Sequence, residues 1–237
     1  MKKKIIITGG KGKFASYFKK YSKKYNIKFP DKNKMNILNR TKLSKYLNAN
    51  KPDYIIHNAA LSRPMSLHEK DIVQSINKNI VGTCNIVTES FKRKIKLIYF
   101  SSNYVYPCKK GNYKETDALL PKNNYAWSKL GGECAVQMYK NSLILRLSVT
   151  EKPFVHKNAY TNVRSSFIFH TEAASIVMKL IDEIGVINIG GKNQSIFQFA
   201  KKNSKNVNPI KYKNKTDLLP KNSSLNLSKL KSILKLS

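Results

Sequence analysis

Acidic residues are scarce in this chain of 237 residues, and arginine is scarcer still. There are 13 Asp and Glu residues against 45 Lys and Arg, of which five are Arg, so the formal net charge is +32. Such an excess indicates either a surface for nucleic acid or another polyanion, or a drift of composition toward lysine and asparagine. The lysines are spread along the whole chain, without an arginine-rich block or a basic–aromatic alternation. We therefore favour drift, and nucleic acid is the less favoured partner.

Cysteine and histidine are too few and too scattered to form a metal site or a disulfide framework. Cys84, Cys108 and Cys134 show neither spacing, which favours reduced thiols in a cytoplasmic protein. No apolar run approaches the ~20 residues of a membrane span. The basic opening is followed by a run of only Ile5–Ile7, too short for a secretory signal. We expect a cytoplasmic protein with no metal and no membrane partner.

Short apolar runs alternate with helical stretches along the chain. The expected strands are Lys4–Thr8, Ile27–Phe29, Met35–Leu38, Tyr54–His57, Leu97–Ser101, Leu143–Leu147 and Val186–Ile189. The expected helices are Phe14–Tyr25, Thr41–Asn48 (capped by Thr41), most of Ser66–Arg93, Asn124–Tyr139, Thr171–Ile184, Ile196–Lys202 and Leu225–Leu236, with loops over Lys152–Ser166 and Asn203–Ser224. This order predicts an α/β fold with a Rossmann-like, doubly wound parallel sheet. We divide it into a nucleotide-binding domain, 1–149, and a small substrate-binding lobe, 150–237. Helices or strands of the lobe could also pack as part of the nucleotide-binding domain.

A glycine-rich turn follows the first expected strand. The segment TGGKGKFA, Thr8 to Ala15, fits G-x-x-G-x-x-A from Gly9 and G-x-G-x-x-A from Gly10. Glycines let the backbone turn tightly and approach a pyrophosphate, and the start of the following helix supplies N–H groups. The strand–turn–helix context predicts a phosphate-binding loop. Its candidate cofactor contacts are Gly9, Gly10, Gly12, Lys13 and Phe14.

The residues that would choose between NAD and NADP are ambiguous. Asp31, just after the second expected strand, could accept a hydrogen bond from the ribose of NAD. Lys28, Lys32 and Lys34 could instead meet the 2′-phosphate of NADP. Because lysine is frequent everywhere in the chain, both cofactors stay open.

Two Tyr-x-x-x-Lys pairs are present, about the number that chance gives with 13 tyrosines and 40 lysines. Residues at i and i+4 share a face only on a helix. Pro107 moves Tyr106 out of helical geometry, which argues against Tyr106/Lys110. Tyr125/Lys129 lies instead at the start of an expected helix.

That helix can be capped by Asn123 or Asn124, and a serine pair, Ser101-Ser102, precedes it at the end of an expected strand. A hydroxyl, a phenol and an ammonium brought together can handle a carbonyl oxygen during hydride transfer. We therefore expect a hydride-transfer site around Tyr125 and Lys129.

These segments resemble the extended short-chain dehydrogenase/reductases that act on nucleotide sugars, the epimerase/dehydratase family, and above all its dTDP-4-dehydrorhamnose reductase-like members. The resemblance rests on the glycine loop, PDYIIHNAA (52–60), NIVGT (79–83), the long block SSNYVYPCKKGNYKETDALLPKNNYAWSKLGGE (101–133), LILRLS (143–148), FIFHTEAASIVMKLI (167–181) and INIGG (187–191). It covers about four-fifths of the chain. The chain is shorter than most such enzymes, which implies a reduced substrate lobe.

The resemblance implies roles for individual residues. Ser102 would hydrogen-bond the carbonyl oxygen, and Tyr125 would donate its proton. Lys129 would lower the pKa of Tyr125 and hold the nicotinamide ribose. Further cofactor contacts would come from Asn58, Ala59, Ala60 and Asn79. The implied activity is NAD(P)H-dependent reduction of a 4-keto nucleotide sugar in carbohydrate biosynthesis, with a homodimer left open.

Departures from the family pattern bear on the substrate. Asn103 stands where these reductases often carry Asp, and Arg146 and Arg164 could contact a diphosphate or make salt bridges at the sheet edge. No acid pair follows Ser102, which argues against a 4,6-dehydratase. An NAD-dependent 4-epimerase remains the enzymatic alternative. A non-catalytic Rossmann protein that binds nucleic acid is the alternative of another class.

Overall fold

The centre of the structure is a six-stranded sheet in which every strand runs parallel to its neighbours. In the computed structural model, which describes residues 1–204, 206–213 and 220–235, the strand order is β10-β5-β4-β3-β1-β2. The strands are β1 Lys4–Ile7, β2 Asn26–Lys28, β3 Tyr54–His57, β4 Lys96–Ser102, β5 Ser142–Leu147 and β10 Gly185–Ile189. Strands β3, β4 and β5 are buried along their whole length, as expected for a sheet covered on both faces.

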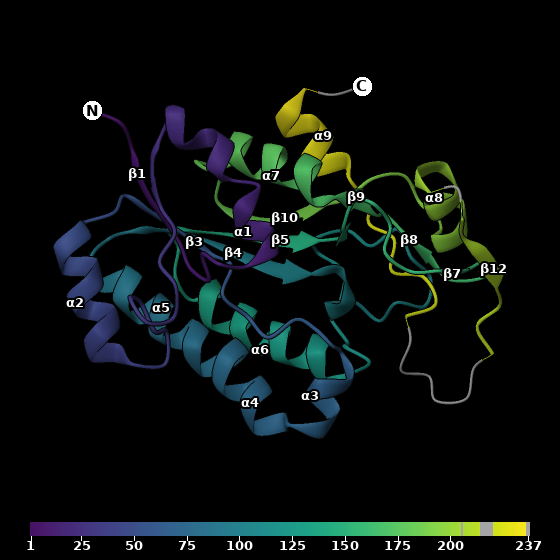
Figure 1. The fold of residues 1–237 in the computed structure, drawn as a ribbon, viewed down its shortest axis with the longest axis horizontal. Helices are drawn as coiled ribbons and strands as arrows, with labels where there is room; N and C mark the ends of the chain where they lie inside the picture. Colours follow the sequence, from purple (N-terminus) through teal and green to yellow (C-terminus); the bar gives the residue numbers. More distant parts are fainter. Residues whose placement is uncertain (205, 214–219, 236–237) are drawn as a thin grey trace.

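Helices cover both faces of this sheet (Figure 1). On one face lie α1 (Lys13–Ser16), α7 (His170–Lys179) and α9 (Ser228–Leu234), and on the other α2 (Arg40–Asn50), α5 (Gly82–Lys92) and α6 (Asn124–Gln137). Alternate residues of each strand point to the two layers. Ile5, Ile98 and Leu145 pack toward the first layer, and Ile6, Leu97 and Ile144 toward the second. The expected α/β fold with a doubly wound parallel sheet is confirmed.

The direction of winding reverses at β1. From β1 the chain crosses to β2 on one side and returns through α2 to β3 on the other. In open sheets of this kind the ligand binds at the carboxyl ends of the strands beside such a reversal. This places the binding site among the loops after β1, β3, β4 and β5.

The chain beyond residue 149 is built from short pieces and returns to the main sheet. The small strands are β6 Val149–Thr150, β7 Asn158–Tyr160, β8 Arg164–Ser165, β9 Ile168–Phe169, β11 Gln194–Ser195 and β12 Asn208–Ile210, and the remaining helix there is α8 Ile196–Asn203. β10 pairs with β5 in parallel over five residues of the central sheet. The domain division at 149/150 stays a prediction.

The expected helix Phe14–Tyr25 is wrong in extent. The structure has one α-helical turn, α1, then a 3₁₀ segment at Lys19–Lys23. Gly12 caps α1 without a side-chain hydrogen bond, and lysines four residues apart, such as Lys19 and Lys23, repel one another on a helix. The aromatic side chains still pack on the sheet.

Two further local predictions are corrected. Met35–Leu38 is not a strand: the Asn36 side chain accepts from the Leu38 N–H at 3.0 Å, which forms a turn, while Met35 and Ile37 are buried beside α2. Helix α2 is capped by Asn39, whose side chain accepts from the Lys42 N–H at 2.9 Å, and not by Thr41.

The 66–93 stretch is helical with interruptions, as expected. It comprises α3 Ser66–Lys70, α4 Ile72–Ile76, a π-helical turn at Asn77–Val81, and α5. The predicted loop 203–224 and terminal helix 225–236 each include positions outside the described residues. Among the described residues, no helix has the length and apolar character needed to cross a membrane. No group of three or more His, Cys, Asp or Glu side chains positioned for a metal ion occurs there either.

Candidate active site

The glycine loop packs so closely against the segments after β2 and β3 that Gly9 and Gly10 have no room for side chains. Gly9 has a φ of +64°, and a Cβ at that position would lie 2.9 Å from the Ala59 Cα. A Cβ on Gly10 would lie 2.4 Å from the backbone of Phe29. The loop is closed by the Gly12 N–H, which donates to the Gly9 carbonyl at 2.8 Å. A bare backbone of this shape fits the close approach of a pyrophosphate.

A buried hydroxyl–imidazole chain joins the ends of β1 and β3 behind this loop. The Thr8 hydroxyl lies 2.8 Å from His57 Nδ1 and accepts from the Ala59 N–H at 2.8 Å. His57 Nε2 lies 3.1 Å from the Thr83 hydroxyl on α5. Burial, helped by the nearby Lys129 charge, lowers the pKa of His57 to about 3. The imidazole is therefore neutral and acts as a hydrogen-bonded spacer between strands and helix.

Asn58 and Asn79 organise the loop after β3. The Asn58 amide donates to the Gly9 carbonyl at 3.4 Å. The Asn79 side chain accepts from the Leu61 N–H at 2.7 Å and donates to the Leu61 carbonyl and to the Ser128 hydroxyl. Because Asn79 is buried and fully bonded within the protein, it positions the loop. Direct cofactor contact by Asn58, Ala59 and Ala60 stays a prediction, and the contacts of Asn79 argue against one.

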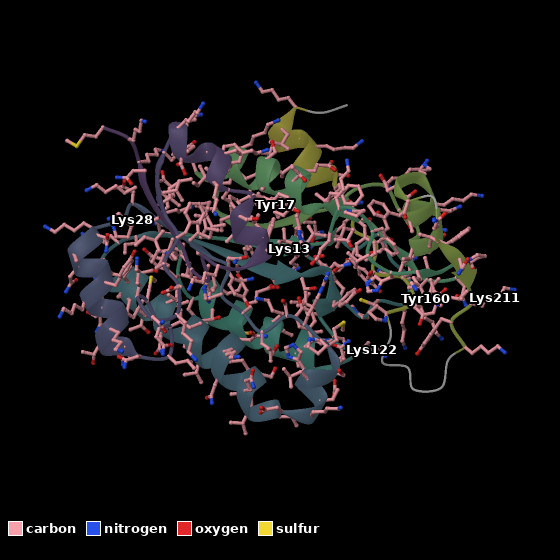
Figure 2. All side chains as sticks on the ribbon, in the orientation of Figure 1. Lys13, Tyr17, Lys28, Lys122, Tyr160 and Lys211 are labelled. Carbon is pink, nitrogen blue, oxygen red and sulfur yellow. The ribbon has the colours of Figure 1, made fainter. Side chains whose placement is uncertain are left out.

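Asp31 lies beside the glycine loop, where the adenosine ribose of a dinucleotide would come. Its carboxylate is 2.9 Å from Lys11 Nζ and accepts from the Lys34 N–H. These contacts lower the pKa of Asp31, with the Lys11 hydrogen bond as the largest cause. Lys28 is directed elsewhere: it donates to the Asn50 side chain at 2.6 Å, and Figure 2 shows it well away from Lys13. Of the lysines considered from the sequence, Lys28 is therefore not at the ribose position, whereas Lys11, which was not considered, contacts Asp31.

The structure brings Ser102 and Tyr125 together at the carboxyl end of β4. Asn123 caps α6 by accepting from the Ala126 N–H at 2.9 Å, which sets Tyr125 in the first turn. Burial raises the pKa of Tyr125, and a hydrogen bond from Ser102 and the charge of Arg63 oppose that rise. The phenol therefore carries its proton at neutral pH, beside a hydroxyl that is itself 5% exposed.

Lys129 lies one turn further along α6 and is almost completely buried. Its ammonium is 4.3 Å from the centre of the Tyr99 ring, a cation–π contact. Burial lowers the pKa of Lys129 to about 7, although the Glu133 charge acts in the opposite direction. The charge of Arg63 lowers the pKa of Tyr125. The expected effect of Lys129 on the pKa of Tyr125 stays a prediction.

Two aromatic rings hold the Tyr125 ring edge-on. His68 lies 5.2 Å away at 70°, and Tyr104 lies 6.4 Å away at 87°, measured between ring centres. His68 is completely buried, and its Nδ1 lies 2.7 Å from the Ser75 hydroxyl on α4. Edge-to-face pairs of this kind restrict the ring without blocking its hydroxyl. Sequence reasoning missed both rings, which come from α3 (Ser66–Lys70) and from the 3₁₀ turn Asn103–Val105.

The contacts of Arg146 argue against the predicted diphosphate contact: it makes a salt bridge, but a buried one on the interior strand β5 and not one at the surface or the sheet edge. Arg146 is 2% exposed, and its Nη2 lies 2.6 Å from Glu133 Oε1. It also donates to the Tyr106 hydroxyl at 2.7 Å and to the Glu115 carbonyl. Because Glu133 further accepts from Ser101 at 2.6 Å, this network fixes α6 against β4 and β5.

Asn103 and Arg164 lie on the substrate side of Ser102. Asn103 is buried and donates to the Ser223 carbonyl at 3.0 Å and to the Ser165 hydroxyl. Arg164 is exposed and donates to the Asn193 side chain at 2.9 Å. Their roles as substrate contacts stay predictions.

Arg63 and Glu151 are charged residues that sequence reasoning missed. Arg63 Nη1 lies 3.0 Å from Glu151 Oε1, and Lys13 Nζ also contacts that carboxylate. Arg63 was detectable in principle, because it is one of five arginines in a chain whose other basic residues are lysine. Glu151 is one of the 13 acidic residues and follows the strand segment β6 directly.

The doubly wound sheet, the glycine loop and the grouped Ser102, Tyr125 and Lys129 define a short-chain dehydrogenase/reductase of the extended type. The particular family follows from a family model, the RmlD substrate binding domain, which matches residues 2–176. Because that match covers more than half of the chain, the protein belongs to this family.

Individual relatives support the same assignment. The dTDP-4-dehydrorhamnose reductase of Aggregatibacter actinomycetemcomitans is 25% identical over 205 residues, 84% of this chain and 68% of that enzyme. The methionine adenosyltransferase 2 subunit beta of Xenopus tropicalis is 34% identical over 122 residues, 48% of this chain and only 34% of that subunit. The crystal structure of the Bacillus anthracis dTDP-4-dehydrorhamnose reductase in complex with NADP superimposes with a TM-score of 0.88 at 22% identity, covering 100% of this chain and 93% of that chain.

Proposed function

We propose that the protein reduces a 4-keto nucleotide sugar with NADPH or NADH. The observation that carries the proposal is the buried meeting of the Ser102 hydroxyl with the protonated Tyr125 phenol at the carboxyl end of β4. The glycine loop, whose backbone would be obstructed by a side chain at Gly9 or Gly10, fits the dinucleotide. The relatives named as reductases of dTDP-4-dehydrorhamnose support the substrate class.

The environment of each active-site residue fits a specific role in the proposed reaction. The bound nicotinamide supplies the hydride. Tyr125, protonated because burial raises its pKa, donates its proton to the sugar keto oxygen, and Ser102 donates a hydrogen bond to the same oxygen as negative charge develops. Lys129, one turn along α6 from Tyr125, would bind the nicotinamide ribose and, when charged, favour the phenolate form of Tyr125. Asp31 and Lys11 would meet the adenosine ribose, so the choice between the two cofactors depends on them.

The proposal is tested with NADPH oxidation in the presence of a panel of 4-keto nucleotide sugars. We expect Tyr125→Phe to lower kcat by roughly 10²–10⁴-fold, the usual worth of a positioned proton donor. Tyr106→Phe, the tyrosine of the other Tyr-x-x-x-Lys pair, is the matched control for loss of a buried phenol. It should leave kcat within a few-fold, although it removes a bond to Arg146 and lowers stability.

An unaltered rate in Tyr125→Phe, or no oxidation of NADPH or NADH with any sugar, would refute the reductase. Purification with tightly bound NAD and no net oxidation would support the 4-epimerase instead. A role as a subunit of another enzyme, as in the methionine adenosyltransferase relatives, predicts indifference to Tyr125→Phe.

A further inference from the structure

Glu151 connects the glycine loop to the loop that follows β3. Its carboxylate receives the Lys13 ammonium on one oxygen and the Arg63 guanidinium on the other, the latter at 3.0 Å. The carboxylate side chain is 15% exposed, whereas those of Lys13 and Arg63 are 57% and 53% exposed. Both cations lower the pKa of Glu151, with the Lys13 hydrogen bond as the largest cause. The mostly buried Glu151 carboxylate is thus paired with two cations, Lys13 and Arg63, that are themselves exposed to solvent.

The three residues come from loops that surround the reversal of the sheet. Lys13 directly follows Gly12, Arg63 follows β3, and Glu151 follows β6. Figure 2 shows Lys13 near the middle of the view, beside Tyr17 of the same segment. In sheets of this type the phosphates of a dinucleotide lie at this point. The Glu151 carboxylate therefore binds the two cations, Lys13 and Arg63, that a diphosphate bound at this point would contact.

A second observation points to a missing ligand at the same place. His170, at the start of α7, is 9% exposed and lies with its ring centre 4.9 Å from that of Phe14. Its Nδ1 is buried and has no hydrogen-bond partner within the described part of the chain. Phe14 directly follows Lys13, so its ring contact brings His170 close to the same cluster, and the charges of Glu151, Arg63 and Lys13 act on the pKa of His170.

We propose that Lys13 and Arg63 are a diphosphate-binding pair, and that Glu151 closes this pair in the free protein and is displaced when the diphosphate binds. The proposal deepens the proposed function and rests on it. Both the dinucleotide cofactor and a nucleotide sugar carry a diphosphate. The position of Lys13 within the glycine loop favours the cofactor.

The test measures the Kd of NADPH by fluorescence titration for the full chain and its variants. We expect Glu151→Gln to bind NADPH roughly three- to tenfold more tightly, because the competing carboxylate is removed from two partly exposed ion pairs. Arg63→Gln should bind about five- to twentyfold more weakly. In the Arg63→Gln background the gain from Glu151→Gln should fall below about twofold, because the two residues act on each other.

A matched control separates this local effect from the overall charge. Asp182→Asn also removes one carboxylate, but its partners Lys3 and Tyr54 lie at the amino-terminal ends of β1 and β3, opposite the carboxyl ends that carry the site. It should leave the NADPH Kd unchanged. An equal gain in Asp182→Asn and Glu151→Gln would overturn the proposal, since it would show a general effect of net charge.

Parallel titrations with dTDP and with inorganic pyrophosphate identify the source of the diphosphate. A gain for NADPH and pyrophosphate assigns the pair to the cofactor, and a gain for dTDP and pyrophosphate assigns it to the nucleotide sugar. If no variant changes the binding of NADPH, dTDP or pyrophosphate, the diphosphate pair is refuted while the reductase stays intact. If neither the wild-type protein nor any variant binds NADPH or NADH, the proposed function fails together with this inference.

Discussion

Replacing Lys129 with methionine should stabilise the fold while it removes the activity. The Lys129 side chain is 5% exposed, and its burial lowers the pKa from 10.5 to about 7. One unit of pKa corresponds to about 1.4 kcal/mol, so holding the ammonium in the folded protein costs about 4–5 kcal/mol below pH 7. Methionine has nearly the same length and no charge. We therefore expect Lys129→Met to raise the free energy of unfolding by about 2–5 kcal/mol at pH 6.

The gain has a definite pH dependence. Below pH 7 Lys129 is charged in both the folded and the unfolded chain, and its cost is complete. Between pH 7 and 10.5 the folded chain binds fewer protons than the unfolded chain, so the cost falls by about 1.4 kcal/mol for each pH unit. The advantage of Lys129→Met should therefore be largest at or below pH 7 and shrink steadily as the pH rises.

Urea unfolding of the two proteins at pH 6, 7, 8 and 9 measures this difference, with NADPH oxidation followed in parallel. Lys110→Met is the matched control, because Lys110 belongs to the other Tyr-x-x-x-Lys pair and is exposed. Its effect on unfolding should be small and flat with pH. A difference between the Lys129→Met and wild-type proteins that does not vary with pH, or a variant less stable than wild type at pH 6, would refute the reasoning.

Two further predictions concern the framework and the cofactor. Glu133→Gln leaves the Arg146 guanidinium buried without its carboxylate partner. We expect it to lower the free energy of unfolding, measured in urea, by about 3–5 kcal/mol. A loss below about 1 kcal/mol would show that the network is dispensable. Asp31→Ala removes the carboxylate beside the glycine loop. In a fluorescence titration it should raise the Kd of NADH roughly tenfold and that of NADPH much less. Equal effects on the two cofactors would show that Asp31 does not recognise the ribose.

Much of the central sheet could be predicted because its signal is local. A short apolar run followed by glycines, or by a serine pair, identifies a strand and its carboxyl end without knowledge of the rest of the fold. The choice of Tyr125/Lys129 over Tyr106/Lys110 also used local chemistry, since Pro107 and the Asn123 cap act on their own neighbours. The structure agrees: Tyr106 is completely buried and donates to the Asn188 side chain at 2.9 Å.

The failures arose where a contact distant in sequence decides the outcome. Met35 and Ile37 look like strand residues, but packing against α2 and the sheet buries them without any strand pairing. Arg146 looked like a diphosphate ligand until its partner Glu133 was known. Arg63 and Tyr125 are 62 positions apart, and nothing in either segment indicates that one charge reaches the other. Such pairings require the tertiary structure.

Because Asn103 donates a hydrogen bond to the Ser223 carbonyl, the surroundings of Ser102 are completed late in translation, after the residues of the cofactor site have been made. Asn103 adjoins Ser102, and the segment that carries Ser223 also pairs Leu225 with Tyr113 and Asn222 with Arg164. A nascent chain that has completed the glycine loop, β4 and α6 already holds the groups for cofactor and proton transfer. It still lacks the segment around residues 222–225, which holds Asn103 in place beside Ser102. A ribosome-bound chain stalled before residue 222 should therefore bind the dinucleotide before it can turn over a sugar.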